Sequence, residues 1–529
     1  MEGQVQQQQH NGLDPPPQKA PQKEKTVIPV WAYLYCAAAS MMSFTYGFNS
    51  AIVASAMVFI PDMSMGEAAA IVSIMLFGAF LGSFAAGPLA DLLGRKPVML
   101  CNYAFVLVAA LGSALVSASW QLVIWRFLVG VGAGVASVVP ALYVTEVSPA
   151  AVRGMLSTGN QLAGSLGIVT AYFAGATIVA CQTAQCWRWM FATGTLFAVT
   201  GFVATCFIPE SPRWLLAIRK SREEALRVLE KVYGVLNEGE LRVEYRRMCD
   251  QMNSTRHKDE EARWRDLGRR QYRKPLLISA LFLPLLQGLS GNTTLVYYTV
   301  LLLTSLGLTR ERAVLYAALS SLPQPLMLAI VFFIMDRVGR KLLLLISIAG
   351  TAVSTLTMGI LLYFYRTTTD ADAAQQGYFT NKALILTGIV MFRMFYAVGL
   401  GPVPQVLAPE LLPFAVRARG TAISLGVYWL TVGIVSALFP PLLRLLPAYS
   451  IYACFTVLLV LGLFLAAWLV RETKRKSLEE IESMHCLPVL APDGSNRDAL
   501  PQESMIARLK PVTVLMPPSS PSSSSAAAV

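Results

Sequence analysis

Long apolar stretches recur along the chain and are separated by short polar segments. Each stretch is long enough to cross the hydrocarbon core of a bilayer, which takes roughly 20 mostly apolar residues in a helix. A longer polar segment at about 209–274 divides them into six and six. The pattern predicts an all-α membrane protein with twelve transmembrane helices, at approximately 30–54, 68–90, 98–117, 120–144, 157–180, 189–208, 275–303, 312–335, 342–365, 382–408, 420–444 and 449–470.

The polar segments complete the predicted organisation. The first 29 residues contain a glutamine run and a proline run but no apolar core, so they do not resemble a signal peptide. Both tails have too few apolar residues to fold, and we expect them to be disordered. The central segment alternates charged and apolar residues, which predicts short amphipathic helices. The expected divisions are a tail at 1–29, a six-helix half at 30–208, a linker at 209–274, a second half at 275–470 and a tail at 471–529.

Positive charge is distributed unevenly between the two sides of the predicted bundle. The 529-residue chain has a net charge of +12 with only 14 % charged residues. Arginine and lysine gather in the linker, after the last span and after even-numbered spans, and such loops face the cytoplasm. We therefore expect both termini and the linker to be cytoplasmic, in a plasma-membrane protein whose basic side contacts lipid. Because this asymmetry accounts for the charge, we do not expect a nucleic-acid partner.

Composition offers little for catalysis. The eight cysteines form no Cys-x-x-Cys pair, and no metal-binding, nucleophilic or phosphate-binding constellation stands out. We expect neither an enzyme nor a bound metal or cofactor. Nothing in the sequence predicts the oligomeric state.

Two motifs recur at matching places in the two predicted halves. Asp-x-x-Gly-Arg-Lys follows the second span at 91–96 and the eighth at 336–341. Glu-x-x-Pro-x-x-x-Arg ends the fourth span at 146–153 and the tenth at 410–417. The recurrence predicts duplicated six-helix units, which usually enclose a midplane site and move against each other.

The charged residues of these motifs lie at the inner ends of neighbouring helices. Ion pairs among them would hold the cytoplasmic side shut and release it when the halves rock; alternatively, they only anchor loops at the lipid headgroups. The candidate gating residues are Asp91, Arg95, Glu146 and Arg153 in the first half and Asp336, Arg340, Glu410 and Arg417 in the second.

Together the motifs resemble the sugar porter family of the major facilitator superfamily, and within it the facilitative hexose transporters, over about residues 30–482. Further motifs are Arg126-Phe127 with Gly130, Pro-Glu-Ser-Pro-Arg-Trp-Leu at 209–215, Gln287-x-x-x-Gly291 and Gly401-Pro402-x-Pro404. The resemblance implies the major facilitator fold and a monosaccharide substrate. It also adds Glu210 and Glu472, from the motifs that follow each half, to the gating set; Arg471 and Arg475 depart from the usual closing motif.

A sugar site needs amides and hydroxyls to bond the sugar hydroxyls and aromatic rings to stack on. Polar side chains inside a membrane tend to face a cavity, although some only join helices. By this test the candidate ligands are Asn49, Gln161, Gln287, Asn292, Thr293, Gln324, Gln405 and Trp429, with Thr294 and Tyr428 beside them. The resemblance supports Gln161, Gln287, Gln324 and Trp429 in particular.

Several positions depart from the glucose transporters that the chain resembles. Gly288 replaces the second glutamine of a usual pair, and the asparagine expected at Thr293 is one place earlier, at Asn292. Gln405 replaces a tryptophan, and Ala397 replaces a glutamate. The predicted site has lost a large ring and gained an amide, which would suit another hexose, fructose in particular, or a polyol.

Proton coupling needs a titratable group in the transport path. Proton-coupled sugar porters use an aspartate in the first span, where this chain has Asn49, and all three histidines lie outside the spans. This favours a uniporter over a proton-coupled sugar or polyol symporter. Arg126 is expected from the family, but Arg393 is not. An unpaired buried cation is costly, so Arg393 should meet carbonyls, water or an anion. Facing the cavity it would suit an organic anion, and facing lipid it would have no role. A sugar sensor that does not transport is a further alternative.

Overall fold

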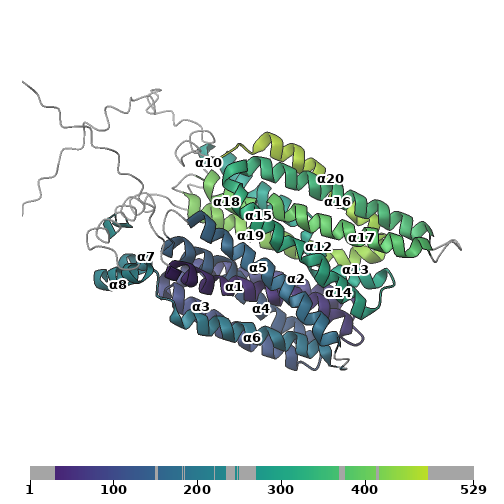
Figure 1. The fold of residues 1–529 in the computed structure, drawn as a ribbon, viewed down its shortest axis with the longest axis horizontal. Helices are drawn as coiled ribbons and strands as arrows, with labels where there is room; N and C mark the ends of the chain where they lie inside the picture. The colour runs from purple at the N-terminus through teal and green to yellow at the C-terminus, as the bar shows by residue number, and fades with distance from the viewer. Residues whose placement is uncertain are drawn as a thin grey trace, which may run out of the picture.

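The fold is known from a computed structural model, which describes residues 30–148, 153–180, 183, 185–219, 221–233, 245–246, 248–249, 270–368, 376–412 and 416–474. These residues are almost entirely helical, and Figure 1 shows a bundle of long helices lying roughly side by side. Eleven helices of the described chain are long and apolar enough to cross a membrane. The predicted all-α membrane fold is therefore confirmed.

The first group of helices matches the first six predicted spans, mostly with an added turn at one end or both. Polar residues are tolerated in these added turns because they lie at the ends of the bundle. Ser64 begins the second helix by accepting a hydrogen bond from the Glu67 amide, which forms a capping box. The helices are α1 (Val30–Ala56), α2 (Met65–Leu93), α3 (Arg95–Leu115), α4 (Ser119–Val147), α5 (Arg153–Ala180) and α6 (Cys186–Phe207).

The second group is more interrupted than the pattern predicts. Its members are α10 (Arg270–Leu276), α11 (Leu283–Leu289), α12 (Asn292–Tyr297), α13 (Thr299–Ser305), α14 (Arg310–Ser321), α15 (Pro323–Val338), α16 (Arg340–Thr368), α17 (Gln376–Phe395), α18 (Val403–Leu411), α19 (Arg417–Leu445) and α20 (Ala448–Leu469), with π-helical turns at Leu277–Phe282 and Tyr396–Leu400.

The seventh predicted span, 275–303, is thus a series of short helices instead of one. Gly291 adopts a φ of 86°, which favours glycine, and Tyr298 interrupts the helix a second time with a φ of −119°. In the tenth span a π-helical turn precedes Gly401 and Pro402. Breaks of this kind expose backbone groups and are tolerated in a membrane where they line a cavity.

The two groups pack internally and then against each other. Within the first group α1 packs on α5, α2 on α4, and α3 on α6; within the second, α16 packs on α17 and α20. Between the groups α2 packs along α19, and α5 contacts α14 and α15. Figure 1 shows the first group in purple and blue and the second in green and yellow.

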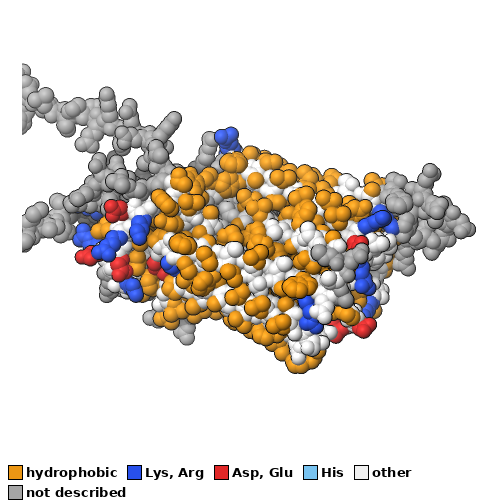
Figure 2. Space-filling model, turned by 60° about the horizontal axis from the view of Figure 1, so that its bottom comes forward, with side chains coloured by type: hydrophobic (Ala, Val, Ile, Leu, Met, Phe, Trp, Pro, Cys, Tyr) orange, Lys and Arg blue, Asp and Glu red, His pale blue; other side chains and the backbone are white. Residues whose placement is uncertain are grey.

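The outer surface of the bundle is apolar. Figure 2 shows hydrophobic side chains covering its middle, with charged side chains at the two ends. Apolar side chains near the middle of their helices, such as Val108, Leu196, Val353 and Val457, are mostly exposed. An apolar surface between two charged ends is what a lipid bilayer requires of the surface it contacts.

Two short helices lie at one end of the bundle, which we call the linker end; the opposite end is the far end. They are α7 (Pro212–Ala217) and α8 (Arg222–Tyr233), both in the segment predicted to hold amphipathic helices. Ser211 caps α7, and the indole of Trp214 donates a 2.8 Å hydrogen bond to the carbonyl of Asp91 at the end of α2. The linker is thereby attached to the first group.

Candidate functional site

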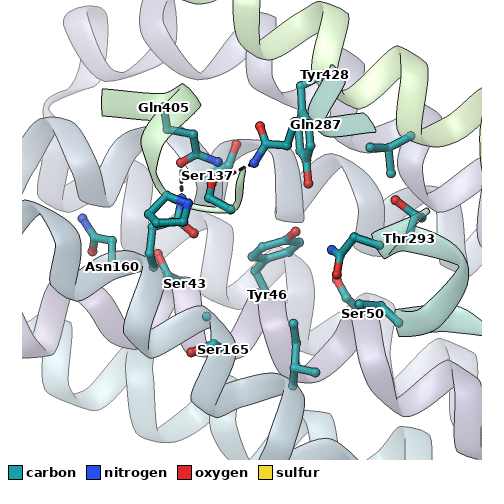
Figure 3. A pocket seen from close by; sticks show the side chains of 18 of the residues that line it. Ser43, Tyr46, Ser50, Ser137, Asn160, Ser165, Gln287, Thr293, Gln405 and Tyr428 are labelled. Carbon is teal, nitrogen blue, oxygen red and sulfur yellow. Dashed lines mark hydrogen bonds between the residues drawn. The ribbon is translucent and has the colours of Figure 1, made fainter. Parts of the chain in front are cut away.

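A cavity of about 190 Å³ lies between the two groups of helices. Seven of the eight side chains predicted to bind sugar line it, and they come from α5, α11, α12, α15, α18 and α19. Figure 3 shows side chains from both groups converging on it. The seven are Gln161, Gln287, Asn292, Thr293, Gln324, Gln405 and Trp429.

Glutamine side chains from opposite groups of helices meet within the cavity. The Gln161 amide nitrogen donates a hydrogen bond to the Gln405 side-chain oxygen, which joins the first group to the second. Gln287 donates to the carbonyl of Gly401 over 2.8 Å and lies 3.5 Å from the Tyr396 hydroxyl. The π-helical turn before Gly401 thus supplies a backbone acceptor to the cavity wall. Each of these amides keeps further donor or acceptor capacity for a ligand.

Aromatic rings form another part of the wall. The rings of Tyr46 and Trp429 meet edge to face, with centroids 5.6 Å apart, although they belong to opposite groups. Tyr428 lies 5.2 Å from Trp429 in the same manner. Rings beside amides provide both contacts that a sugar offers, an apolar ring face and a rim of hydroxyls.

Asn49 lies apart from the other predicted ligands. On α1, Ser43, Tyr46 and Ser50 line the cavity, whereas Asn49 does not. Its side chain donates 2.9 Å to the carbonyl of Thr45 and lies against Gly194 of α6, inside the first group. Successive residues of a helix are rotated by about 100°, so Asn49 points away from the neighbouring Ser50. The structure therefore does not support the prediction that Asn49 contacts the substrate directly.

The sequence reading missed several polar lining residues. Ser43, Tyr46 and Ser50 recur on one face of α1, and Asn160 and Ser165 flank Gln161 on α5. Helical spacing of polar positions in an otherwise apolar span is a signal that would have identified them. Serine in such spans often bonds its own helix backbone instead, as Ser165 does with Leu162.

The cavity lies toward the linker end. Ala141 near the end of α4 and Ser157 near the start of α5 both line it. Gln405 is an exposed residue, although it faces the opposite group of helices. Beyond Ile168, the lining residue of α5 nearest the far end, Tyr172 is fully buried and donates to the carbonyl of Val296 in α12. The described structure is thus closed on the far side of the cavity.

The predicted gating charges of the first half form a connected cluster at the linker end. Arg95 pairs with Glu146 at 2.8 Å and with Asp91 at 3.1 Å. Glu210 accepts hydrogen bonds from the backbone amides of Arg95 at 3.0 Å and Lys96 at 3.2 Å, at the start of α3. Burial raises the pKa of the Glu210 carboxyl, and these backbone amides act in the opposite direction. A carboxylate at this position complements the helix dipole.

The second half repeats the arrangement. Arg340 lies 3.5 Å from Glu410, and Glu472 accepts from the backbone amides of Arg340 at 3.0 Å and Lys341 at 3.1 Å. Gly94 and Gly339 precede the two capped helices with φ of 104° and 109°. A Cβ at either glycine would lie 2.5 to 2.7 Å from the capping carboxylate.

These ion pairs join helix ends within one group. Arg417 donates from Nε to the carbonyl of Leu412 in its own group over 3.2 Å. The side chains of Arg153 and Asp336 lie outside the described residues. A gate made by charges that cross between the groups remains a prediction, whereas the clusters seen here fasten the helix ends of each group.

Both arginines within spans are buried. Arg126 is 0 % exposed and Arg393 is 1 % exposed. Neither lines the cavity, and neither reaches the lipid-facing surface. The cavity-facing and lipid-facing positions considered for Arg393 are therefore wrong. Its expected contact with a carbonyl is present, because its guanidinium donates to the carbonyl of Leu295 and lies against the ring of Tyr172 in the interior.

Comparison with known proteins adds to this geometry. The family described as "Sugar (and other) transporter" matches residues 35–485. Plastidic glucose transporter 4 of Arabidopsis thaliana is 32 % identical over 464 residues, which cover 86 % of this chain and 80 % of that protein. The glucose transport protein of Synechocystis is 31 % identical over 462 residues, covering 84 % and 95 %. The proton:xylose symporter XylE, solved with 6-bromo-6-deoxy-D-glucose, shares the fold with a TM-score of 0.70 at 23 % identity, covering 86 % and 99 %.

Proposed function

The chain belongs to the sugar transporter family of the major facilitator superfamily, and from this premise we propose that it is a facilitative hexose carrier that works by alternating access. The observation that carries the proposal is the cavity of amides and rings between the two groups of helices. Each group contributes polar side chains, so a sugar bound there contacts both. Relative movement of the groups then exposes the sugar to one side of the membrane at a time.

The lining residues favour a neutral substrate. None of the described residues that line the cavity is Asp, Glu, His, Lys or Arg. A transported organic anion would need a cationic partner, and the two buried arginines are directed elsewhere. A neutral polyhydroxylated molecule matches this lining better than an anion does.

The same lining favours uniport over proton symport. A coupled proton needs a carboxylate or histidine that gains and loses it within the transport path. The first-span position that is acidic in proton-coupled porters is Asn49 here, whose amide does not titrate in the physiological range. The gradient of the sugar alone then drives its movement.

Two departures favour fructose alongside or above glucose. Gln405 fills the position of a tryptophan, and Ala397 lines the cavity where a glutamate is usual. The cavity thus has an additional amide and lacks one ring. A hexose that depends less on stacking an apolar ring face and more on hydrogen bonds gains most from this change.

We further propose that the linker end faces the cytoplasm of a plasma-membrane carrier. Arg95, Arg340, Lys341 and the helices α7 and α8 all lie at this end. Basic residues near the ends of membrane helices concentrate on the cytoplasmic side. In this orientation the cavity described above is nearer to the cytoplasm.

Uptake by the purified protein in liposomes tests the proposal. Labelled glucose and fructose should enter down their gradients, at rates that do not change when a proton gradient is imposed. Uptake that stays at the level of protein-free liposomes would contradict the transport function. Uptake that depends on an imposed proton gradient would support symport instead, and inhibition by organic anions but not by hexoses would support an anion carrier. Sugar binding without flux would indicate a sensor.

A further inference from the structure

A buried cation joins the two groups of helices on the far side of the cavity. The Nη2 atom of Arg393 in α17 lies 2.9 Å from the carbonyl oxygen of Leu295 and 3.5 Å from the hydroxyls of Thr299 and Tyr172. Its guanidinium carbon lies 5.3 Å from the centre of the Tyr172 ring. Tyr172 belongs to α5 in the first group, whereas the other partners belong to the second. The cation therefore contacts both groups at once.

This contact sits at the interruption of the seventh span. α12 ends at Tyr297 and α13 begins at Thr299, so Leu295 and Val296 lie just before the break. Arg393 donates to the carbonyl of Leu295, and the Tyr172 hydroxyl donates to that of Val296. Val296 itself lines the cavity. Separating α5 from α12 on this side would open the cavity to the far end and break the contacts of Tyr172.

Arg126 holds a matching place in the first half. It lies in the fourth span, donates to the carbonyl of Asn49 in the first span over 3.1 Å, and lies 4.2 Å from the ring centre of Phe191. Arg393 lies in the fourth span of its own half, donates to a carbonyl in the first span of that half, and also lies against a ring. The ring partner of Arg126 is in its own group, whereas that of Arg393 is in the opposite group. Only Arg393 stacks across the interface.

The charge of Arg393 is incompletely compensated where it lies. Among the described residues no aspartate or glutamate forms an ion pair with it, and its Nε and Nη1 atoms have no hydrogen-bond partner. Those two atoms carry three of the five N–H hydrogens of a guanidinium. Burying a cation is costly unless its hydrogens are paired, and one ring and one short carbonyl contact return only part of the cost. Water reaching the site would satisfy all of the hydrogens.

From this balance we propose that the charge of Arg393 destabilises the state in which the far side is closed, and so favours the return of the carrier to its far-side-open state. The inference rests on the proposed alternating access. It predicts the direction of the change: without the charge of Arg393, the carrier should spend more time with the far side closed. If Arg393 instead held the far side shut through its contacts with Leu295 and Tyr172, its removal would open that side.

A cysteine reporter shows whether replacing Arg393 closes the far side or opens it. Ser55 in α1 is 0 % exposed, and it lies beside Gly175 of α5, which is also close to Val314 of α14 in the second group. In a protein whose native cysteines have been replaced, Ser55→Cys should react with a membrane-impermeant maleimide only while the far side is open. We expect Arg393→Met and Arg393→Gln to slow this labelling by about tenfold. Arg393→Lys keeps the charge and should label at the unaltered rate.

The design separates charge from contact. Arg393→Gln still offers an amide donor to the Leu295 carbonyl, so a contact-based latch predicts little change in that variant and faster labelling in Arg393→Met. Either result would overturn the proposal, as would unaltered labelling in both. Arg126→Met is the matched control, because it neutralises the equivalent cation within the first group and should leave the labelling rate unaltered. If Arg393→Met does not fold, as judged by thermal unfolding, Arg393→Gln carries the test alone.

The labelling reads the position of the helices and needs no sugar flux. Hexose uptake at background together with the expected labelling would contradict the proposed substrate and still support the role of Arg393. Normal uptake together with faster labelling in the neutral variants would support the proposed substrate and contradict the role of Arg393.

Discussion

Amide side chains supply much of the hydrogen-bonding capacity of the cavity. Gln405, which the family resemblance places where a tryptophan is usual, accepts a hydrogen bond from Gln161 across the cavity. A substrate hydroxyl that enters between the two amides replaces this bond with bonds of its own. The identity of residue 405 should therefore affect selectivity more than expression or folding.

Replacing Gln405 tests this directly. Gln405→Trp restores a ring and removes the bond to Gln161, so the ratio of kcat/KM for glucose over fructose should rise by roughly tenfold, the scale of one gained or lost site contact. Competition uptake with the two sugars measures the ratio. Gln405→Leu removes the amide without adding a ring, and it should weaken uptake of both sugars. An unchanged ratio in Gln405→Trp would show that residue 405 does not select the sugar.

Asn49 allows a test of proton coupling. Its side-chain oxygen is buried without a partner in the described structure, and Arg126 donates to its backbone carbonyl. Asn49→Asp places a titratable carboxylate near this arginine, and we expect sugar uptake to become dependent on pH where uptake by the unaltered protein is not. Asn49 and Asn102 both line a separate small cavity inside the first group of helices, so Asn102→Asp adds a carboxylate there and serves as the control. Equal pH profiles for all three proteins would contradict the expectation.

The sequence predicted most of the amides that line the cavity because amides are rare inside membrane spans. Seven candidates line the cavity. The side chain of Asn49 instead points into the interior of the first group, and Ser43, Tyr46 and Ser50 of the same helix face the cavity. The direction of a side chain depends on the phase of its helix against its neighbours, and hydropathy alone does not fix that phase. Hydropathy likewise could not predict the partners of Arg393, because Leu295 lies beside the break between α12 and α13 and Tyr172 belongs to the other half.

At the scale of elements, the starts of α3 and α16 show how one local device is used twice. Each helix begins after a glycine with a positive φ, and its first backbone amides donate to a carboxylate from the segment that follows its own half. The device depends on the absence of a Cβ at Gly94 and Gly339. The hydrogen bonds attach the segment after each half to the start of the third span of that half.

Gly94→Ala should therefore destabilise the protein. The positive φ costs roughly 1–2 kcal/mol for a residue with a Cβ, and that Cβ would lie 2.5 Å from the Glu210 carboxylate. Thermal unfolding in detergent measures the change. Gly87→Ala in α2 is the matched control, because a Cβ there meets nothing within 4 Å, and it should be neutral or stabilising. Equal unfolding temperatures for the two variants would contradict this account of the cap.

Element positions were mostly predictable, whereas interruptions were not. Hydropathy located the twelve stretches because each must match the bilayer thickness. It did not locate the breaks at Gly291 and Tyr298 or the π-helical turn before Gly401. Such breaks depend on tertiary partners that satisfy the freed backbone groups, for example Gln287 on the carbonyl of Gly401. The local sequence at a break does not indicate which distant residues will be those partners.

At the scale of the whole molecule, the two groups of helices meet along α2 and α19. A Cβ at Gly433 of α19 would lie 3.6 Å from the Cβ of Leu76 in α2, a separation that suits a disulfide. The double variant Leu76→Cys with Gly433→Cys should cross-link on oxidation. Because the proposed alternating access requires the halves to move against each other, the cross-link should abolish most of the sugar uptake, and a reductant should restore it.

Mobility on a non-reducing gel and uptake before and after reduction check this expectation. Each single variant under the same oxidant is the control and should retain its uptake. Full uptake by a completely cross-linked protein would show that this contact lies on the axis of the movement, so that the halves rock without separating there.

The paired carboxylates of Glu210 and Glu472 bear on the ancestry of the molecule. Each comes from the segment after the sixth span of its half, and each returns to the third span of that half. If the two halves arose by duplication, the duplicated unit was longer than six helices, because it already included the segment whose carboxylate caps the third span of its own half. Each copy would then have been held together by its own trailing segment, and the present linker is one such segment that also joins the two halves.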